Sequence, residues 1–371
     1  MGGTIDASIR ARDSMGAAET TTAIILAGLI ILFLSVSLYG RIAALSWERT
    51  PYPPGRLISA AGTRLYVRVK GTDMPVVVIE PALGSPGAEW WHIQDELAKT
   101  TTVVTYDRAG YGWSKPGVRP RTALQVAEEL HTVLHNADLP GPYILVGHAQ
   151  GGLYMQLFGR MYQDEVIGAV FLDPLSSDNR RFKAELKPEV YKNSQVDKLP
   201  TFKTLATLQR LGLTRVLRAV TERKVPGYHQ SLPAPTREVI WQHYALPKAR
   251  SAMMDEYAQN ATSANTSDIR SAGTFPPVPV KIIYHSPRRM VRELSTQGRL
   301  QRDDADEVEM IWEQLVRGYL RLSPHGEWIV AQESGHYIHL DEPDVVLDEI
   351  RGLVHVVRES TGLGPQKSTS K

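Results

Sequence analysis

A glycine-rich turn between a strand and a helix constrains the fold of this sequence more than any other feature. Residues 143–146 form a short apolar run that predicts a buried strand. The segment Gly147 to Gly152 follows at once, and residues 153–161 then have a helical pattern. Glycine permits the close backbone approach that a sharp strand-to-helix turn requires. The sequence therefore predicts a buried strand that turns sharply into a helix.

Several other apolar runs recur along the chain, and most are followed by a loop and a helical pattern. Short β-branched runs that alternate with helices are typical of a parallel sheet covered on both faces. A hairpin is also predicted over residues 56–69, with its turn at residues 61–63. The expected parallel strands are residues 76–79, 102–106, 143–146, 169–172, 280–284 and 328–331.

The long stretch between the fourth and fifth of these strands has helical patterns, several prolines and no convincing strand. A plain loop of that length is uncommon, so we expect a helical insert over the strand ends. The expected organisation is a disordered N-terminal segment at 1–19, a transmembrane anchor at 20–40, a linker at 41–55, an α/β core at 56–173 and 278–359, a helical cap at 174–277 and a disordered tail at 360–371.

The N-terminal apolar run predicts a membrane anchor. Residues 20–40 carry no charge, and about 20 apolar residues match the thickness of a bilayer. A cleaved signal peptide has a shorter apolar run and a small-residue cleavage site, of which residues 42–44 are a poor version. We expect an uncleaved single-pass anchor with the lipid bilayer as partner; a signal peptide and a buried helix stay open as alternatives. Two arginines on each side of the run give no orientation.

Composition excludes several classes of function. The chain has 42 Lys and Arg against 40 Asp and Glu, so its balance does not indicate nucleic-acid binding. It has no cysteine, which rules out a thiolate nucleophile, a disulfide framework and a Cys-ligated metal. His131 and His135 have the spacing of a metal pair on a helix, but the sequence shows no acidic ligand near them. No metal and no cofactor are expected.

The glycine-rich turn has the pattern of a nucleophile elbow, Gly-X-Ser-X-Gly, with alanine at the central position. Ala149 cannot attack a carbonyl. A phosphate-binding turn is the other use of such a sequence, but this one has neither the dinucleotide spacing nor a Walker lysine. The helix after the turn directs its N-terminal amides at the same point, so we expect a reaction site around Ala149.

A candidate general base follows the last predicted strand. His336 lies in the segment 334–340, at the carboxyl end of the sheet, where a base can reach a nucleophile on the elbow. His339 is expected to pack or to lie at the surface, and His148 to face the core or a neighbouring strand.

Three motifs, taken together with their order along the chain, give the sequence from about Leu57 to Arg358 a resemblance to the α/β-hydrolase superfamily. They are the elbow 147–152, the Gly-rich turn 107–114 and the segment 334–339. The resemblance implies an eight-stranded, mostly parallel sheet with a helical cap, and hydrolysis through an acyl-enzyme.

The acid partner of the base has several candidate positions in the sequence. After the strand 280–284, one common place for it, the chain continues with His285 and has no carboxylate. Asp173, at the end of the preceding strand, can hydrogen-bond an imidazole and fix its tautomer, and we prefer it. The alternative carboxylates, which have the pattern of a helix start, are Asp303, Asp304 and Asp306.

The oxyanion site is expected to consist of two backbone amides, those of Ala82 and Gln150. Pro81 cannot donate, and Glu80 is expected to brace this loop. Asp107 and Arg108 form a pair that can tie two loops together. Trp90 and Trp91 are candidates for lining the mouth of the substrate pocket.

Ala149 has two explanations: replacement of a catalytic serine, or a natural relative without catalysis. Because the other expected site residues are intact, we favour the replacement. The sequence then predicts a membrane-anchored serine hydrolase of carboxylic esters, lipophilic esters or lactones among them, with a small-molecule ester as substrate. A non-catalytic protein that binds a hydrophobic ligand, and a C–C hydrolase or lyase on the same fold, are the alternatives.

Overall fold

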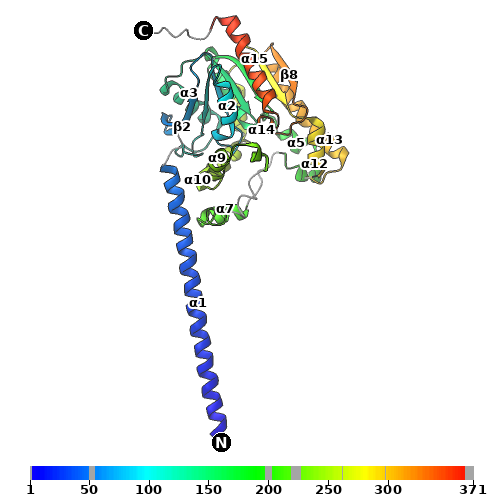
Figure 1. The fold of residues 1–371 in the computed structure, drawn as a ribbon. Helices are drawn as coiled ribbons and strands as arrows, with labels where there is room; N and C mark the ends of the chain where they lie inside the picture. Colours follow the sequence, from blue (N-terminus) through cyan, green and yellow to red (C-terminus); the bar gives the residue numbers. More distant parts are fainter. Residues whose placement is uncertain are drawn as a thin grey trace, which may run out of the picture.

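The fold is built on one sheet of eight strands in the order β1-β2-β4-β3-β5-β6-β7-β8. The computed structural model describes residues 2–49, 55–196, 203–218, 227–260, 262–296 and 298–363. Helices cover the sheet on both sides (Figure 1), so the predicted α/β architecture is confirmed. The strands are β1 (Arg56–Ala60), β2 (Thr63–Lys70), β3 (Val76–Glu80), β4 (Thr102–Tyr106), β5 (Tyr143–His148), β6 (Val166–Leu172), β7 (Val280–Tyr284) and β8 (Gly326–Val330).

Strand direction determines where functional loops gather. The pair β1 and β2 is antiparallel, as the predicted hairpin requires, and β2 is also antiparallel to β4. All remaining pairs are parallel. The carboxyl ends of six strands therefore lie at one edge of the sheet, where a ligand site is expected in a fold of this kind.

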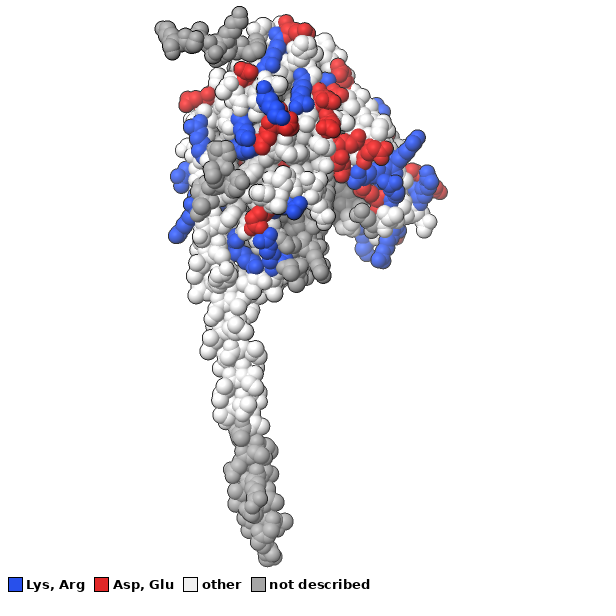
Figure 2. Space-filling model, in the orientation of Figure 1, with Lys and Arg blue, Asp and Glu red and all other residues white. Residues whose placement is uncertain are grey.

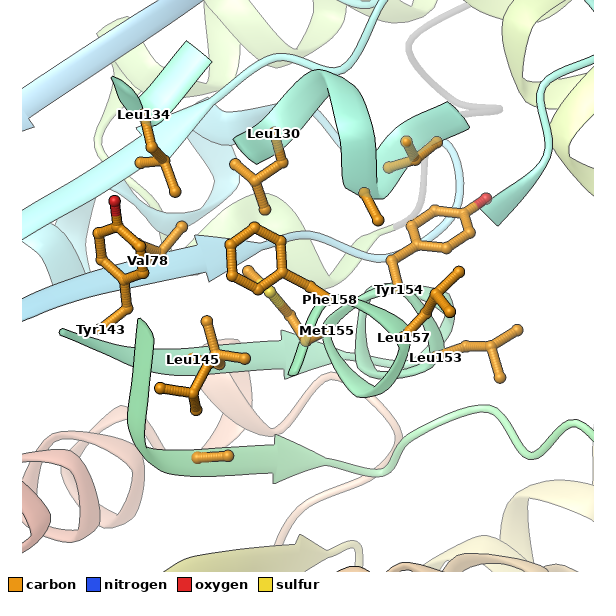
Figure 3. Packing of buried hydrophobic residues seen from close by; sticks show 14 of the residues in the cluster. Val78, Leu130, Leu134, Tyr143, Leu145, Leu153, Tyr154, Met155, Leu157 and Phe158 are labelled. Atoms are coloured by element: carbon orange, nitrogen blue, oxygen red, sulfur yellow. The ribbon is translucent and has the colours of Figure 1, made fainter. Parts of the chain in front are cut away.

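The two faces of the sheet pack into separate apolar clusters. Along β3, Val76 and Val78 belong to one cluster, and Val77 and Ile79 to the other, because successive side chains of a strand point to opposite faces. Figure 3 shows α4 side chains packed against α3 on the first face. The first face is covered by α3 (Ala123–Asn136) and α4 (Gln150–Met161), and the second by α2 (Trp91–Leu97) and α15 (Pro343–Thr361).

Between β6 and β7 the described residues form helices and no strand, in keeping with the expected cap. These elements are α5 (Arg180–Glu185), α6 (Pro188–Ser194), α7 (Lys203–Arg210), η3 (Gly227–Ser231), α9 (Ala234–Tyr244), α10 (Pro247–Asn260) and α11 (Ser263–Ser271). The other short or late elements are η1 (Gly87–Trp90), η2 (Gln163–Glu165), α12 (Pro287–Thr296), α13 (Arg302–Arg317), η4 (Gly318–Leu322) and α14 (Ile338–Asp341).

The N-terminal apolar run lies in one long helix, α1 (Gly2–Arg49), which projects from the folded domain (Figure 1). Its residues from Ala18 to Arg49 are long and apolar enough to cross a membrane, and the most apolar window is not buried. Figure 2 shows little charge on this part of α1, whereas basic and acidic side chains are intermixed on the visible face of the domain. One exposed apolar N-terminal helix suits an anchor or a signal sequence.

The helix is longer than the apolar run. It includes residues 2–19, where we expected disorder, and residues 41–49, where we expected a linker. The physical reason is that no proline interrupts the chain before Pro51, so the backbone can continue as a helix on both sides of the apolar segment. The prolines of the expected linker, and the tail beyond residue 363, lie outside the described residues. The helix α15 itself continues to Thr361.

The carboxyl-terminal part of α1 packs on the domain rather than acting as a free spacer. Trp47 stacks on Trp113 with ring centroids 4.5 Å apart. Near Gly40 the helix meets the turn after α7 so closely that a Cβ on Gly40 would collide with the carbonyl of Gly212. The side chain of Ser37 donates to the carbonyl of Leu211 in the same joint. The helix and the cap are thus in direct backbone contact.

Candidate active site

The elbow has the strained geometry that its sequence predicts. Ala149 lies between β5 and α4 with φ 50° and ψ −117°, a conformation that side chains with a Cβ rarely adopt. Residues are kept in such conformations only where surrounding structure imposes them, and they cluster at functional sites.

Three glycines make this geometry possible. A Cβ on Gly147 would lie 2.7 Å from the Cα of Gly152, and one on Gly151 would lie 2.2 Å from the carbonyl oxygen of Glu80. A Cβ on Gly152 would lie 2.5 Å from the ring of Pro174. The elbow is therefore wedged between the loop after β3 and the loop after β6, and only glycine fits.

Asp173 and His336 meet beside Ala149. The Nδ1 atom of His336 donates to Oδ2 of Asp173 at 2.5 Å. Asp173 is buried, whereas the His336 side chain is 27% exposed. Burial opposes ionisation of Asp173, but the positive charge of His285 and the hydrogen bonds from both histidines outweigh it and hold its pKa below the usual range. Asp173 is thus a carboxylate that can orient His336.

The alternative acids do not approach this pair. Asp303, Asp304 and Asp306 open α13, as the charged helix start in the sequence suggested. Asp304 contacts Lys187 at 3.3 Å, and Asp306 contacts Arg302 at 3.9 Å.

A second histidine, which the sequence did not indicate as functional, also binds Asp173. Nδ1 of His285 lies 2.8 Å from Asp173 Oδ2, and its Nε2 lies 3.0 Å from Oε2 of Glu309. A signal was available: His285 follows β7 at the point where many relatives in the expected fold have their acid. The sequence shows His285 there in place of a carboxylate, but its pattern alone assigns the imidazole no role.

A cavity of about 500 Å³ opens beside Ala149, Asp173 and His336. Its walls combine apolar side chains from the cap with α12 and α13, among them Phe182, Met290 and Trp312. The cavity gives the predicted nucleophile position and base access to one small-molecule-sized space.

Trp90 and Trp91, our candidates for the pocket mouth, do not line this cavity. Trp90 is fully buried and stacks on the ring of His339 at 4.1 Å. Trp91 lies under the guanidinium of Arg68, with 4.9 Å to the ring centroid. Both tryptophans instead pack where the helix after the β3 loop begins.

The loop that carries the predicted oxyanion amide is braced by buried charges. Arg108 donates to the carbonyls of Pro81 and Ala82, each at 2.8 Å, and to Glu80 at 2.6 Å. Burial raises the pKa of Glu80 to about 7, against the lowering effect of Arg108. Glu256 of the cap helix α10 completes the cluster, 3.2 Å from Arg108. The expected bracing by Glu80 and Arg108 is present, and the cap participates in it.

The loop after β3 lies directly against the elbow, as the contact of Gly151 with Glu80 shows. The loop, turn and side-chain hydrogen bonds of the described residues do not use the amide of Ala82 or of Gln150 as donor. Both amides are thus available for a ligand, and their oxyanion role stays a prediction.

One further expectation is changed by the structure. His131 and His135 do have an acidic neighbour, because Glu165 after α4 folds back to 2.8 Å from His131 Nε2. The sequence did not indicate this contact because Glu165 is 34 positions away from His131. The three residues could hold a metal ion, as could Glu89, His148 and His339 in the buried region behind the elbow.

Known proteins identify the class of this fold and site. A model of the α/β hydrolase family matches residues 76–349, which is most of the chain. The chain therefore belongs to the α/β-hydrolase family.

Individual relatives are distant. An "AB hydrolase superfamily protein" from Gibberella zeae is 24% identical over 316 residues, which cover 81% of this chain and 94% of that protein. "Probable transporter efuK" from Hormonema carpetanum is 25% identical over 328 residues, 83% of this chain, but the match spans only 44% of that protein.

Solved structures share the fold at low sequence identity. A thermophilic esterase from Thermogutta terrifontis has a TM-score of 0.54 at 18% identity, with 82% of this chain and 98% of that chain covered. The enol-lactonase from Burkholderia xenovorans has a TM-score of 0.52 at 16% identity, with 81% and 100% covered. These likenesses concern the fold alone.

Proposed function

We propose that this chain is a membrane-anchored serine hydrolase of carboxylic esters in which alanine occupies the nucleophile position. The observation that carries the proposal is the strained elbow at Ala149, beside a His336–Asp173 pair and a cavity. A lone buried carboxylate–histidine pair is common in proteins. One that faces a strained strand-to-helix turn is the arrangement of a nucleophile and its base.

With serine at position 149, the reaction would use the residues as follows. Nε2 of His336 takes the hydroxyl proton while Asp173 accepts from Nδ1 and stabilises the imidazolium. The serine oxygen attacks the ester carbonyl, and the amides of Ala82 and Gln150 donate to the oxyanion. His336 returns the proton to the departing alcohol and then activates the water that releases the acid.

The substrate class is supported by two features. The cavity is lined by apolar side chains such as Phe182, Met290 and Trp312 together with polar ones such as Asn179 and Gln195, and its apolar part suits an acyl or aryl group. The apolar helix α1 would keep the domain at a bilayer, where lipophilic esters and lactones concentrate. An esterase and an enol-lactonase occur among proteins of the same fold.

The test is the substitution Ala149→Ser in the full chain in detergent micelles, assayed with p-nitrophenyl esters of several chain lengths. We expect turnover only in the serine form, and loss of that turnover when His336→Gln is added. A serine form that is folded but no more active than the alanine form on every ester would contradict the proposal.

A second function is favoured by Ala149 itself: a pocket that binds a hydrophobic ligand without reaction. It predicts that the alanine form binds such a ligand and that the serine form gains no turnover. Binding of fluorescent fatty acyl probes to both forms, measured beside the ester assay, separates the two functions.

A further inference from the structure

The carboxylate of Asp173 is shared by two histidines, and only one of them faces the cavity. Strands β6 and β7 are parallel neighbours, and the amide of Asp173 donates to the carbonyl of Ile283 at 2.9 Å. This register places Asp173, which follows β6, beside His285, which follows β7. His285 Nδ1 and His336 Nδ1 therefore reach the same oxygen, Oδ2, at 2.8 and 2.5 Å. The other oxygen, Oδ1, is buried without a partner among the described residues.

His285 is held on its far side as well. Its Nε2 donates to Glu309 of α13, and the hydroxyl of Tyr284 donates to the same carboxylate at 2.7 Å. An imidazole that donates from both nitrogens is an imidazolium. Burial would lower the pKa of His285, but the two carboxylates outweigh it and raise its pKa to about 10. The charged and titratable groups in contact with this ring are Asp173 from β6, the adjacent Tyr284 of β7 and Glu309 from α13.

We propose that His285 is a positioning residue, which Glu309 holds so that Asp173 Oδ2 stays aimed at His336. The proposal rests on the proposed function and deepens it. Because Oδ1 has no other partner, His336 alone would orient the carboxylate if His285 were absent. His285 therefore acts at two points, through its donor to Asp173 and through its contact with Glu309.

Two substitutions separate these effects. His285→Asn keeps a donor near the place of Nδ1 and loses the contact with Glu309; His285→Gln keeps a donor near Nε2 and loses the contact with Asp173. Both remove the charge. In the Ala149→Ser chain we expect His285→Gln to lower kcat about 100-fold with little change in KM, as for a misplaced catalytic group. We expect His285→Asn to retain most of the activity.

A second measurement does not need activity. Diethylpyrocarbonate modifies neutral imidazole, and the partly exposed His336 is accessible to it. In the chain as it is, with Ala149, the rate of His336 modification can be followed by peptide mass spectrometry at a fixed, neutral pH. We expect this rate to change in His285→Gln, which leaves Asp173 without its second donor, and to stay close to that of the parent in His285→Asn. The matched control is His243→Gln, which removes another buried histidine, one that contacts Gly112 and Gly84 and lies in α9.

The outcomes are distinct. A changed modification rate in His285→Gln, but not in His285→Asn or in the control, supports the proposal even if the serine form hydrolyses no ester, in which case only the proposed function fails. An unchanged rate in both His285 variants, with melting temperatures lowered as in the control, overturns it and leaves His285 a packing residue. Ester hydrolysis that is equally fast with His285→Gln overturns it as well.

Discussion

Two buried carboxylate clusters lie at the same edge of the sheet, and they differ in the cation that each contains. In one, Asp173 is bound by His285 and His336, and His336 opens to the cavity. In the other, Glu80 and Glu256 are bound by Arg108, and all three side chains are at most 1% exposed. An imidazole can exchange a proton near neutral pH, whereas a guanidinium cannot. The first cluster can therefore exchange a proton with a ligand in the cavity, whereas the second does not line the cavity and holds the loop and the cap together.

The largest expected effect is on kcat and comes from removing the carboxylate charge of Asp173 in the first cluster. In the Ala149→Ser chain, Asp173→Asn should lower kcat by about 10⁴, because an amide favours the wrong histidine tautomer. The measurement is ester hydrolysis at saturating substrate, with circular dichroism to verify folding. A loss of less than tenfold would show that Asp173 is not the acid of this site.

Disrupting the second cluster should lower the free energy of unfolding of the chain. Arg108→Met leaves Glu80 and Glu256 buried without their cation, and should cost roughly 3–5 kcal/mol of unfolding free energy. Urea unfolding of the full chain in micelles measures it, and Arg64→Met, at an exposed position, is the matched control. If the two arginine variants are equally stable, the bracing role of Arg108 is wrong.

The pH dependence of stability sharpens the contrast. The pKa of His285 is raised from 6.5 to about 10, so its stabilisation is fully present below about pH 6.5 and is lost as pH rises towards 10. The melting-temperature difference between the parent chain and His285→Gln should therefore shrink from pH 7.5 to 10. The corresponding difference for Arg108→Met should persist, since Arg108 keeps its proton throughout that window. Equal pH trends for both variants would remove the distinction.

The smallest expected effect concerns the elbow between the clusters. Ala149→Gly should stabilise the chain by about 1 kcal/mol, because glycine adopts a positive φ without strain. Ala184→Gly in α5 is the control and should destabilise by a similar amount, since it adds glycine to a helix. Thermal unfolding compares them; a loss of stability at both positions would mean that the elbow is unstrained.

The fold was predictable because its signals are local. The strand β5, the turn 147–152 and the helix α4 follow one another in sequence, and each has its own pattern of apolar residues or glycines. Asp173 and His336 were predictable because each follows a strand whose carboxyl end must lie at the same edge. Their direct contact bears out the expected proximity, and their catalytic roles remain for experiment.

The sequence did not reveal the residues that act through contacts between distant elements. Glu309 lies on α13, and nothing in the sequence pattern distinguishes it from the other acidic residues of that helix. Glu256 reaches Arg108 from the cap, 148 positions away. The pairing of Glu165 with His131 was missed for the same reason. Such contacts depend on how helices are placed on the sheet, which periodicity does not encode.

The contact between Gly40 and Gly212 joins the backbone of the N-terminal helix to the turn after α7. It lies at the carboxyl end of the uncharged run, so a bilayer that contained this run would reach almost to the cap. The domain would then rest on the lipid surface in one orientation, without the freedom of a tethered particle. Rotation of α1 about its own axis would move the turn after α7 with it.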